Sequence, residues 1–236
     1  LKSMVEMATA LGEADDARHY ASQLEAMHTL YDARFWNATA GGYVGGSTSL
    51  EHQTLAALAI NTMAGATAPH AAARINATVA LLRADVAARE YHLTVGSAGQ
   101  QWLLRTLSEA GGHDDALRVA TQTTQPSWGF WDANGATTCW ENWSGVADPS
   151  HPPPPTHNHI FLCGGLGEWM HHYLGGIAPA ADGYAAVSVA PHVSRTLGPS
   201  AVNASVDTIR GRVESSWTRA AAAADAPAAA AGAELL

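Results

Sequence analysis

Residues that could carry chemistry gather in one segment, 126–145, which is rich in tryptophan and contains one glutamate, Glu141. Four of the eight tryptophans of the chain lie there, within sixteen positions. Sugar rings stack their C–H faces on indole, sugar hydroxyls bond to polar side chains, and a carboxylate can move a proton. This pattern favours a sugar-binding cleft in which Glu141 does the proton transfer. The residues expected to form the walls of this cleft are Trp128, Trp131, Trp140 and Trp143.

A structural interpretation of the same segment is also open. Tryptophans are large core residues, and Glu141 could be a charge at the start of a helix. The small and turn-forming residues between the tryptophans favour a site built from loops over a regular buried helix.

Two alternating histidines, His157 and His159, follow shortly after the tryptophans. A zinc site needs three or four ligands that converge. The neighbouring pair His171 and His172 would point in different directions on a helix, and His157 and His159 fit a sugar-facing strand as well. We therefore expect neither a metal site nor a cofactor.

The overall composition limits the classes of partner. The chain has 236 residues, 47% of them hydrophobic, and a net charge of −9 with 12 Lys and Arg. Nucleic-acid binding needs a basic face, which this charge balance argues against. The sequence holds no apolar run long enough to span a membrane and no basic amphipathic stretch, so we expect no membrane partner.

Apolar residues at three- and four-residue spacing predict seven helices in the first three quarters of the chain. Glycine-rich turns separate them, which favours antiparallel pairs, and Asp114 is expected to cap one helix. A period of roughly 34 to 45 residues would indicate a solenoid, and none is visible. We therefore predict a partial (α/α)6 toroid. The predicted helices cover residues 4–11, 17–31, 50–63, 71–86, 98–110, 114–123 and 164–173.

The sequence pattern changes after Ile177, where apolar and polar residues begin to alternate as they do in half-buried strands. Three strands are predicted, at 183–191, 201–206 and 210–217, as the start of a truncated β-sandwich. The predicted divisions are 1–177 for the partial barrel, 178–219 for the β-domain, and 220–236 for an alanine-rich tail.

The cysteines and the asparagines of glycosylation sequons bear on the cellular compartment in which the protein folds. Cys139 and Cys163 pair only if they meet in space, and two cysteines in so long a chain are more often free buried residues. Glycosylation sequons exceed chance and hint at a secretory route. The sequence begins without methionine or a signal peptide, so a fragment of a longer product is expected. The sequons start at Asn37, Asn76, Asn142 and Asn203.

Several segments, in this order, resemble the inverting α-L-rhamnosidases of glycoside hydrolase family 78. The likeness covers roughly residues 1–219, and the ordered set is more specific than any one piece. The matching stretches are Glu51-His-Gln-Thr-Leu, Tyr91-His-Leu-Thr-Val-Gly, Leu107-Ser-Glu-Ala-Gly, Pro126-Ser-Trp-Gly-Phe, Gly135-Ala-Thr-Thr-Cys-Trp-Glu, His157-Asn-His-Ile-Phe, Gly167-Glu-Trp-Met and Gly211-Arg-Val-Glu-Ser-Ser-Trp.

The resemblance implies an enzyme that releases terminal α-L-rhamnose from glycosides or polysaccharides. It implies that Glu141 is the general base, that His159 contacts the sugar, and that the general acid lies in a motif upstream of anything present here. This chain then holds half of the catalytic pair and is expected to be inactive alone. Two alternatives stay open: another (α/α)6 carbohydrate hydrolase, such as a fucosidase- or glucoamylase-like enzyme, and a non-catalytic carbohydrate-binding remnant.

Overall fold

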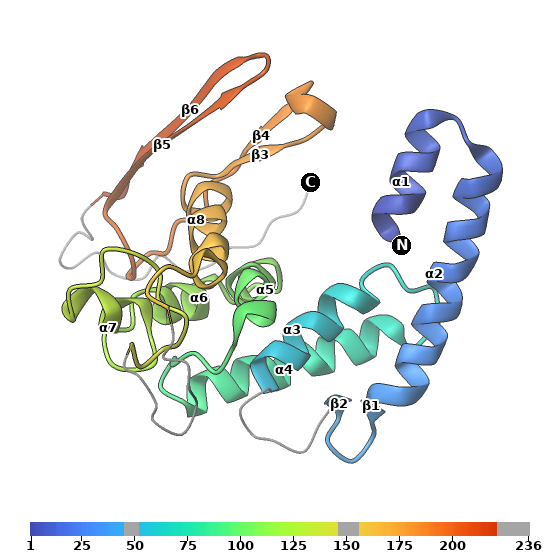
Figure 1. Ribbon diagram of the computed structural model, residues 1–236, viewed down its shortest axis with the longest axis horizontal. Helices are drawn as coiled ribbons and strands as arrows, with labels where there is room; N and C mark the ends of the chain where they lie inside the picture. Colours follow the sequence, from blue (N-terminus) through green and yellow to red (C-terminus); the bar gives the residue numbers. More distant parts are fainter. Residues whose placement is uncertain (45–51, 146–155, 221–236) are drawn as a thin grey trace, which may run out of the picture.

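The computed structural model describes residues 1–44, 52–145 and 156–220. Within these ranges the chain is mainly α-helical, with short antiparallel strands (Figure 1). The α-helices are α1 (Lys2–Leu11), α2 (Ala14–Phe35), α3 (His52–Met63), α4 (Ala71–Ala88), α5 (Ser97–Glu109), α6 (His113–Ala120), α7 (Trp128–Ala133) and α8 (Gly164–Trp169), the last continuing as a π-helical turn, Met170–Leu174.

The helices pack as the glycine-rich turns indicated. Gly12 takes a left-handed conformation with φ of 78° and ends α1, so that α1 and α2 form a hairpin at the edge of the helical body (Figure 1). Helix α3 packs on α4 and α5, and α5 packs on α6 and α8. The fold class predicted from the sequence is confirmed by this arrangement of paired helices followed by strands.

Helix α5 lies at the centre of the main core. Leu103 and Leu107 are 0% and 1% exposed, and Trp169 of α8 is buried against the same cluster. Gly165 packs so closely on α5 that an added Cβ would lie 2.6 Å from the Cα of Gln101. Burial of large apolar side chains on α4, α5, α6 and α8 drives this packing, whereas α1 and α2 bury only Ala8 and His28.

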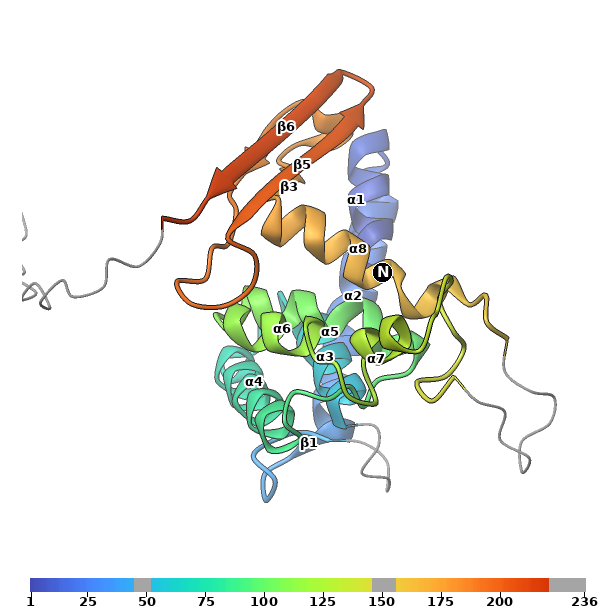
Figure 2. The same cartoon turned by 90° about the vertical axis from the view of Figure 1, so that its left-hand side faces the viewer.

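The strands form three two-stranded antiparallel ladders. They are β1 (Trp36–Asn37) with β2 (Gly42–Tyr43), β3 (Ile177–Pro179) with β4 (Val187–Val189), and β5 (Ala201–Thr208) with β6 (Gly211–Thr218). The β5–β6 hairpin extends beyond the helical body (Figure 2), and the Trp217 indole N–H donates to the Leu174 carbonyl at 2.7 Å. This bond ties the strand region to the π-helical turn.

His113 lies where helix α6 meets the strand region. Its ring stacks on Trp169 with centroids 5.6 Å apart and meets the His192 ring edge-on at 5.0 Å. Its Nδ1 lies 3.1 Å from the Ser108 hydroxyl. Burial lowers the pKa of His113 from its usual value, since the charged imidazolium loses hydration there.

Three local expectations differ from the structure. Helix α7 forms within the tryptophan segment, where no helix was predicted, because the Ser127 hydroxyl caps it by accepting from the Phe130 N–H at 3.0 Å. Helix α6 begins at His113 with Gly112 as its N-cap, so Asp114 lies in the first turn and is not the cap. The strand expected over 183–191 shrinks to β4 because Asp182–Tyr184 forms a 3₁₀ turn. The start of the helix expected over 50–63 and the tail 221–236 lie outside the described residues.

Candidate functional site

Glu141 lies in an irregular segment, 138–143, that follows α7. Its side chain is exposed, and its carboxylate Oε2 accepts a hydrogen bond from the Thr156 backbone N–H at 2.6 Å. The Glu141 N–H in turn donates to the Thr156 carbonyl at 2.9 Å. Among the described residues no ion pair engages this carboxylate. The group is therefore oriented by a backbone donor while its surface faces solvent.

His157 and His159 lie on the segment that runs beside Glu141 in the opposite direction. The His159 N–H donates to the Cys139 carbonyl at 2.6 Å, and the Trp140 ring stacks on His157 at 4.8 Å with planes 24° apart. His157 Nε2 lies 2.9 Å from the Gly145 carbonyl, while the His159 ring is half-buried. The structure thus brings the segments of Glu141 and His159 together.

Of the four tryptophans of the segment, three are buried and Trp143 is half-buried. Trp128, Trp131 and Trp140 are 8%, 3% and 9% exposed and belong to the main core. Trp131 and Trp143 stack with centroids 4.7 Å apart, and Trp128 meets Trp143 edge-on at 5.5 Å. Three of the four candidate wall residues are thus buried and Trp143 is half-buried, because aromatic surface of this size gains free energy from mutual burial.

Indole hydrogen bonds fix the cluster to distant backbone. Trp128 donates to the Leu162 carbonyl at 2.7 Å, Trp131 to the Trp143 carbonyl at 3.2 Å, and Trp143 to the Val95 carbonyl at 2.7 Å. These bonds hold the segment that contains Glu141 onto the helical body.

The two cysteines are bonded to each other, which corrects the expectation that they are free. Cys139 and Cys163 form a disulfide across 24 positions of sequence, with Cα atoms 6.0 Å apart. They meet because residues 138–141 and 156–159 run side by side, a proximity that sequence spacing alone does not reveal.

A loop at 92–96 contacts the tryptophan cluster through the Val95 carbonyl, which accepts the Trp143 indole N–H. Helix α4 ends at Ala88, and the turn after it contains two consecutive left-handed residues, Glu90 and Tyr91, with φ of 53° and 64°. The buried Gln53 side chain then donates to the His92 carbonyl at 3.0 Å and accepts from the Thr94 N–H at 2.9 Å. Gln53 therefore sets the path of this loop toward the Val95 carbonyl that receives Trp143.

Two of these supporting residues, Gln53 and Thr156, had no recognised role in the sequence, whereas His92 was open to either a cleft-facing role or a packing role. Gln53 lies in the Glu51-His-Gln-Thr-Leu stretch of the resemblance, which was a weak signal for it. Thr156 acts through its backbone, so its residue type gave none. His92 uses both ring nitrogens internally, at 2.7 Å from the Arg89 carbonyl and 2.7 Å from the Thr124 hydroxyl, which supports a packing role for it.

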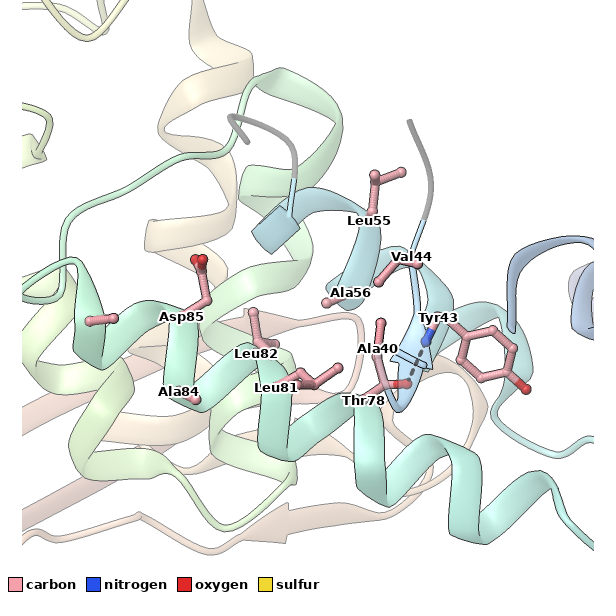
Figure 3. A pocket seen from close by; sticks show the side chains of 11 residues that line it. Ala40, Tyr43, Val44, Leu55, Ala56, Thr78, Leu81, Leu82, Ala84 and Asp85 are labelled. Carbon is pink, nitrogen blue, oxygen red and sulfur yellow. Dashed lines mark hydrogen bonds between the residues drawn. The ribbon is translucent and has the colours of Figure 1, made fainter. Parts of the chain in front are cut away.

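Among the hollows in the described part of the chain, two bear on the site. One of about 430 Å³ is lined by Trp143, Pro126 and loop residues including His92 and Thr94. The other, of about 360 Å³, is mostly apolar and lies between the β1–β2 hairpin, α3 and α4 (Figure 3). There Leu81 and Leu82 point into the hollow, and the Tyr43 N–H donates to Thr78 at 3.1 Å. The first hollow adjoins the Glu141 segment through Trp143.

Other features bear on partners. Within the described ranges no three His, Cys, Asp or Glu side chains group closely enough to hold a metal ion. No helix in the same ranges is long and apolar enough to cross a membrane. Asn37, Asn76 and Asn203 are exposed, whereas Asn142, next to Glu141, is half-buried.

Two family models match the chain. Residues 1–174 match the bacterial alpha-L-rhamnosidase six-hairpin glycosidase domain, and residues 176–225 match the bacterial alpha-L-rhamnosidase C-terminal domain. A curated alpha-L-rhamnosidase of Streptomyces avermitilis is 30% identical over 213 residues, which are 89% of this chain and 19% of that protein. One of Formosa agariphila is 28% identical over 92% of this chain and 22% of its own length.

Solved structures agree with the fold. The alpha-L-rhamnosidase of Streptomyces avermitilis complexed with L-rhamnose superposes with a TM-score of 0.76 at 27% identity, over 92% of this chain and 20% of that one. The alpha-L-rhamnosidase of Aspergillus terreus superposes with a TM-score of 0.77 at 22% identity, over 91% of this chain and 24% of that one. At this identity the likeness supports the fold and not the activity. The chain spans about a fifth of the length of the curated relatives it matches. With most of its length matched by the first model, it belongs to the bacterial alpha-L-rhamnosidase six-hairpin glycosidase domain family.

Proposed function

We propose that this chain is the part of an inverting α-L-rhamnosidase that supplies the general base, Glu141. The observation that carries the proposal is the exposed carboxylate of Glu141, oriented by the Thr156 N–H beside the segment of His159, in a chain of the rhamnosidase family. The proposed substrate is a glycoside or polysaccharide with terminal α-L-rhamnose, in line with the bound L-rhamnose of the Streptomyces relative.

In the proposed reaction Glu141 takes a proton from water as the water attacks the anomeric carbon. The Thr156 N–H holds Oε2, so Oε1 is the oxygen that receives the proton. The bond to the leaving group breaks as a second carboxylic acid protonates the departing oxygen. In an inverting enzyme the two carboxyl groups lie roughly 6.5–9.5 Å apart, which leaves room for the water. The acid is proposed to come from another part of the full-length protein.

The burial of the tryptophans refines their proposed roles. Trp128 and Trp131 support the site from within the core, and Trp140 packs against His157 and Gly145. Trp143 lines the hollow of about 430 Å³ and is the proposed stacking surface for a sugar ring or its aglycone. His159 is the proposed hydroxyl contact. The division into a partial barrel over 1–177 and a β-domain over 178–219 is part of the same proposal.

The test uses the full-length protein that contains this chain, with an aryl α-L-rhamnoside as substrate. Glu141→Gln removes the base and should lower kcat by about 10²- to 10⁴-fold. Glu168→Gln, at an exposed carboxylate on α8, is the matched control and should leave kcat unchanged. NMR of the first-formed sugar should show an inverted anomer.

Two results would contradict the proposal. One is equal activity of Glu141→Gln and Glu168→Gln, and the other is a product of retained configuration. If an aryl α-L-fucoside is cleaved faster than the rhamnoside, the proposed role of Glu141 stands and the proposed substrate is wrong.

A further inference from the structure

We propose that the Cys139–Cys163 disulfide positions the general base, so that reducing it lowers turnover while the protein stays folded. The inference rests on the proposed function of Glu141. Cys139 lies two residues before Glu141, and the loop that the disulfide closes contains both Glu141 and His159. We call residues 138–141, residues 156–163 and their disulfide the base clamp.

The first half of the base clamp depends on the second half for its contacts. The Cys139 carbonyl accepts from the His159 N–H. The Glu141 backbone N–H donates to the Thr156 carbonyl, and the Glu141 carboxylate accepts from the Thr156 N–H. The Thr138 hydroxyl donates to the His157 carbonyl. If residues 156–159 shift, the carboxylate of Glu141 loses the donor that orients it.

The second half of the base clamp is held by the core at its far end. Leu162 is 2% exposed, and its carbonyl accepts the Trp128 indole N–H at 2.7 Å. Just beyond Cys163, the Gly165 N–H donates to the buried side chain of Gln100 at 3.3 Å. Cys163 therefore lies between two fixed points, and the disulfide connects Cys139 to them covalently.

Position matters for a base because proton transfer and attack need close alignment. A displacement of about 1 Å can cost on the order of 10² in rate. Breaking the disulfide leaves the backbone hydrogen bonds between the two segments, which exchange with water at this exposed surface. We therefore expect kcat to fall about 10- to 100-fold on reduction, with smaller changes in binding.

A chemical reductant can reach this bond, because both cysteine residues are half-buried and not sealed in the core. Two thiols of dithiothreitol supply two electrons and two protons. The sulfur–sulfur bond opens to two thiols, and dithiothreitol leaves as its cyclic disulfide. Oxidised dithiothreitol in excess reverses the exchange.

The experiment again uses the full-length protein. Mass spectrometry after alkylation should find Cys139 and Cys163 joined in the native protein and free after reduction. On reduction kcat should fall at least 10-fold and recover on reoxidation, while far-UV circular dichroism stays constant. Calorimetric titration with L-rhamnose should keep its stoichiometry, which separates misplacement of the base from loss of folded protein. A Cys139→Ser/Cys163→Ser variant should have the kcat of the reduced protein, and dithiothreitol should not change that kcat.

Two results would show that the disulfide does not position the base. Free cysteines in the native protein, or a reduced protein whose kcat stays within twofold, would overturn the inference. If the double variant fails to fold, the reduction of the folded native protein decides the question. Glu141→Gln separates the two proposals: if it keeps full activity the proposed function fails, and if it is inactive while reduction has no effect, the base clamp alone is wrong.

Discussion

Replacing Gln53 tests the support of the candidate site from the helical body. Its side chain is 0% exposed and makes two hydrogen bonds, to the His92 carbonyl and from the Thr94 N–H. Gln53→Leu has similar size and leaves both backbone groups without a partner. An unsatisfied buried group costs about 1–3 kcal/mol, and the added apolar burial offsets a part of the sum. We expect a net loss of about 3 kcal/mol in the free energy of unfolding.

Gln53→Glu is the matched variant, since it keeps an acceptor for the Thr94 N–H and loses the donor to the His92 carbonyl. Burial raises the pKa of such a carboxyl, and its protonated form can donate again. Stability gained through a raised pKa is present at low pH and lost as pH rises through the folded-state pKa. The deficit of Gln53→Glu should therefore shrink between pH 7 and pH 5, whereas that of Gln53→Leu should not.

Urea denaturation followed by circular dichroism measures both deficits, and hydrogen exchange at the Thr94 N–H reports on the loop itself. Gln23→Leu, at an exposed position on α2, is the control and should change stability by less than about 0.5 kcal/mol. A loss for Gln53→Leu no larger than that of Gln23→Leu, with unchanged exchange at Thr94, would refute the assigned role of Gln53.

Three further predictions concern stability. Leu103→Ala in the centre of α5, where the side chain is 0% exposed, should cost about 2–5 kcal/mol by urea denaturation, against almost nothing for Leu11→Ala at 77% exposure. The folded-state pKa of His113 is lowered, so His113 destabilises the fold as pH falls below about 6.5, its usual pKa. The melting temperature of His113→Gln should therefore depend less on pH between 7.5 and 5.5 than that of the native chain. The exposed-site variant His19→Gln is the control and should depend on pH as the native chain does. Removing the disulfide frees a loop of 24 positions and should cost about 3 kcal/mol by differential scanning calorimetry; an unchanged melting temperature would contradict this.

The helices were predictable because apolar residues recur at three- and four-residue spacing along the sequence, and in α4, α5 and α6 these residues are buried. Helix α7 was not predictable in this way, since it has only six residues and is stabilised by the Ser127 cap and by packing of Trp128 and Trp131. Likewise, Gly112 took the place of Asp114 as a cap through local backbone geometry that residue type does not reveal.

The candidate site was predictable in composition and less so in geometry. The motif around Glu141 and the following histidines identified the two segments that the structure brings together. The orientation of the tryptophans was not accessible, because their indole partners lie 12 to 48 residues away in sequence. The disulfide was missed for the same reason, since it depends on the pairing of two segments separated by 24 positions.

The left-handed turn after α4 also limits how this family member can vary. Side chains branched at Cβ clash with the backbone at positive φ, so valine, isoleucine and threonine are poorly tolerated at positions 90 and 91. A change there would redirect the following loop and move the carbonyl of Val95 away from its indole donor. Backbone sterics thus restrict the residue type at exposed Glu90 and at half-buried Tyr91, even though neither side chain needs to meet a sugar.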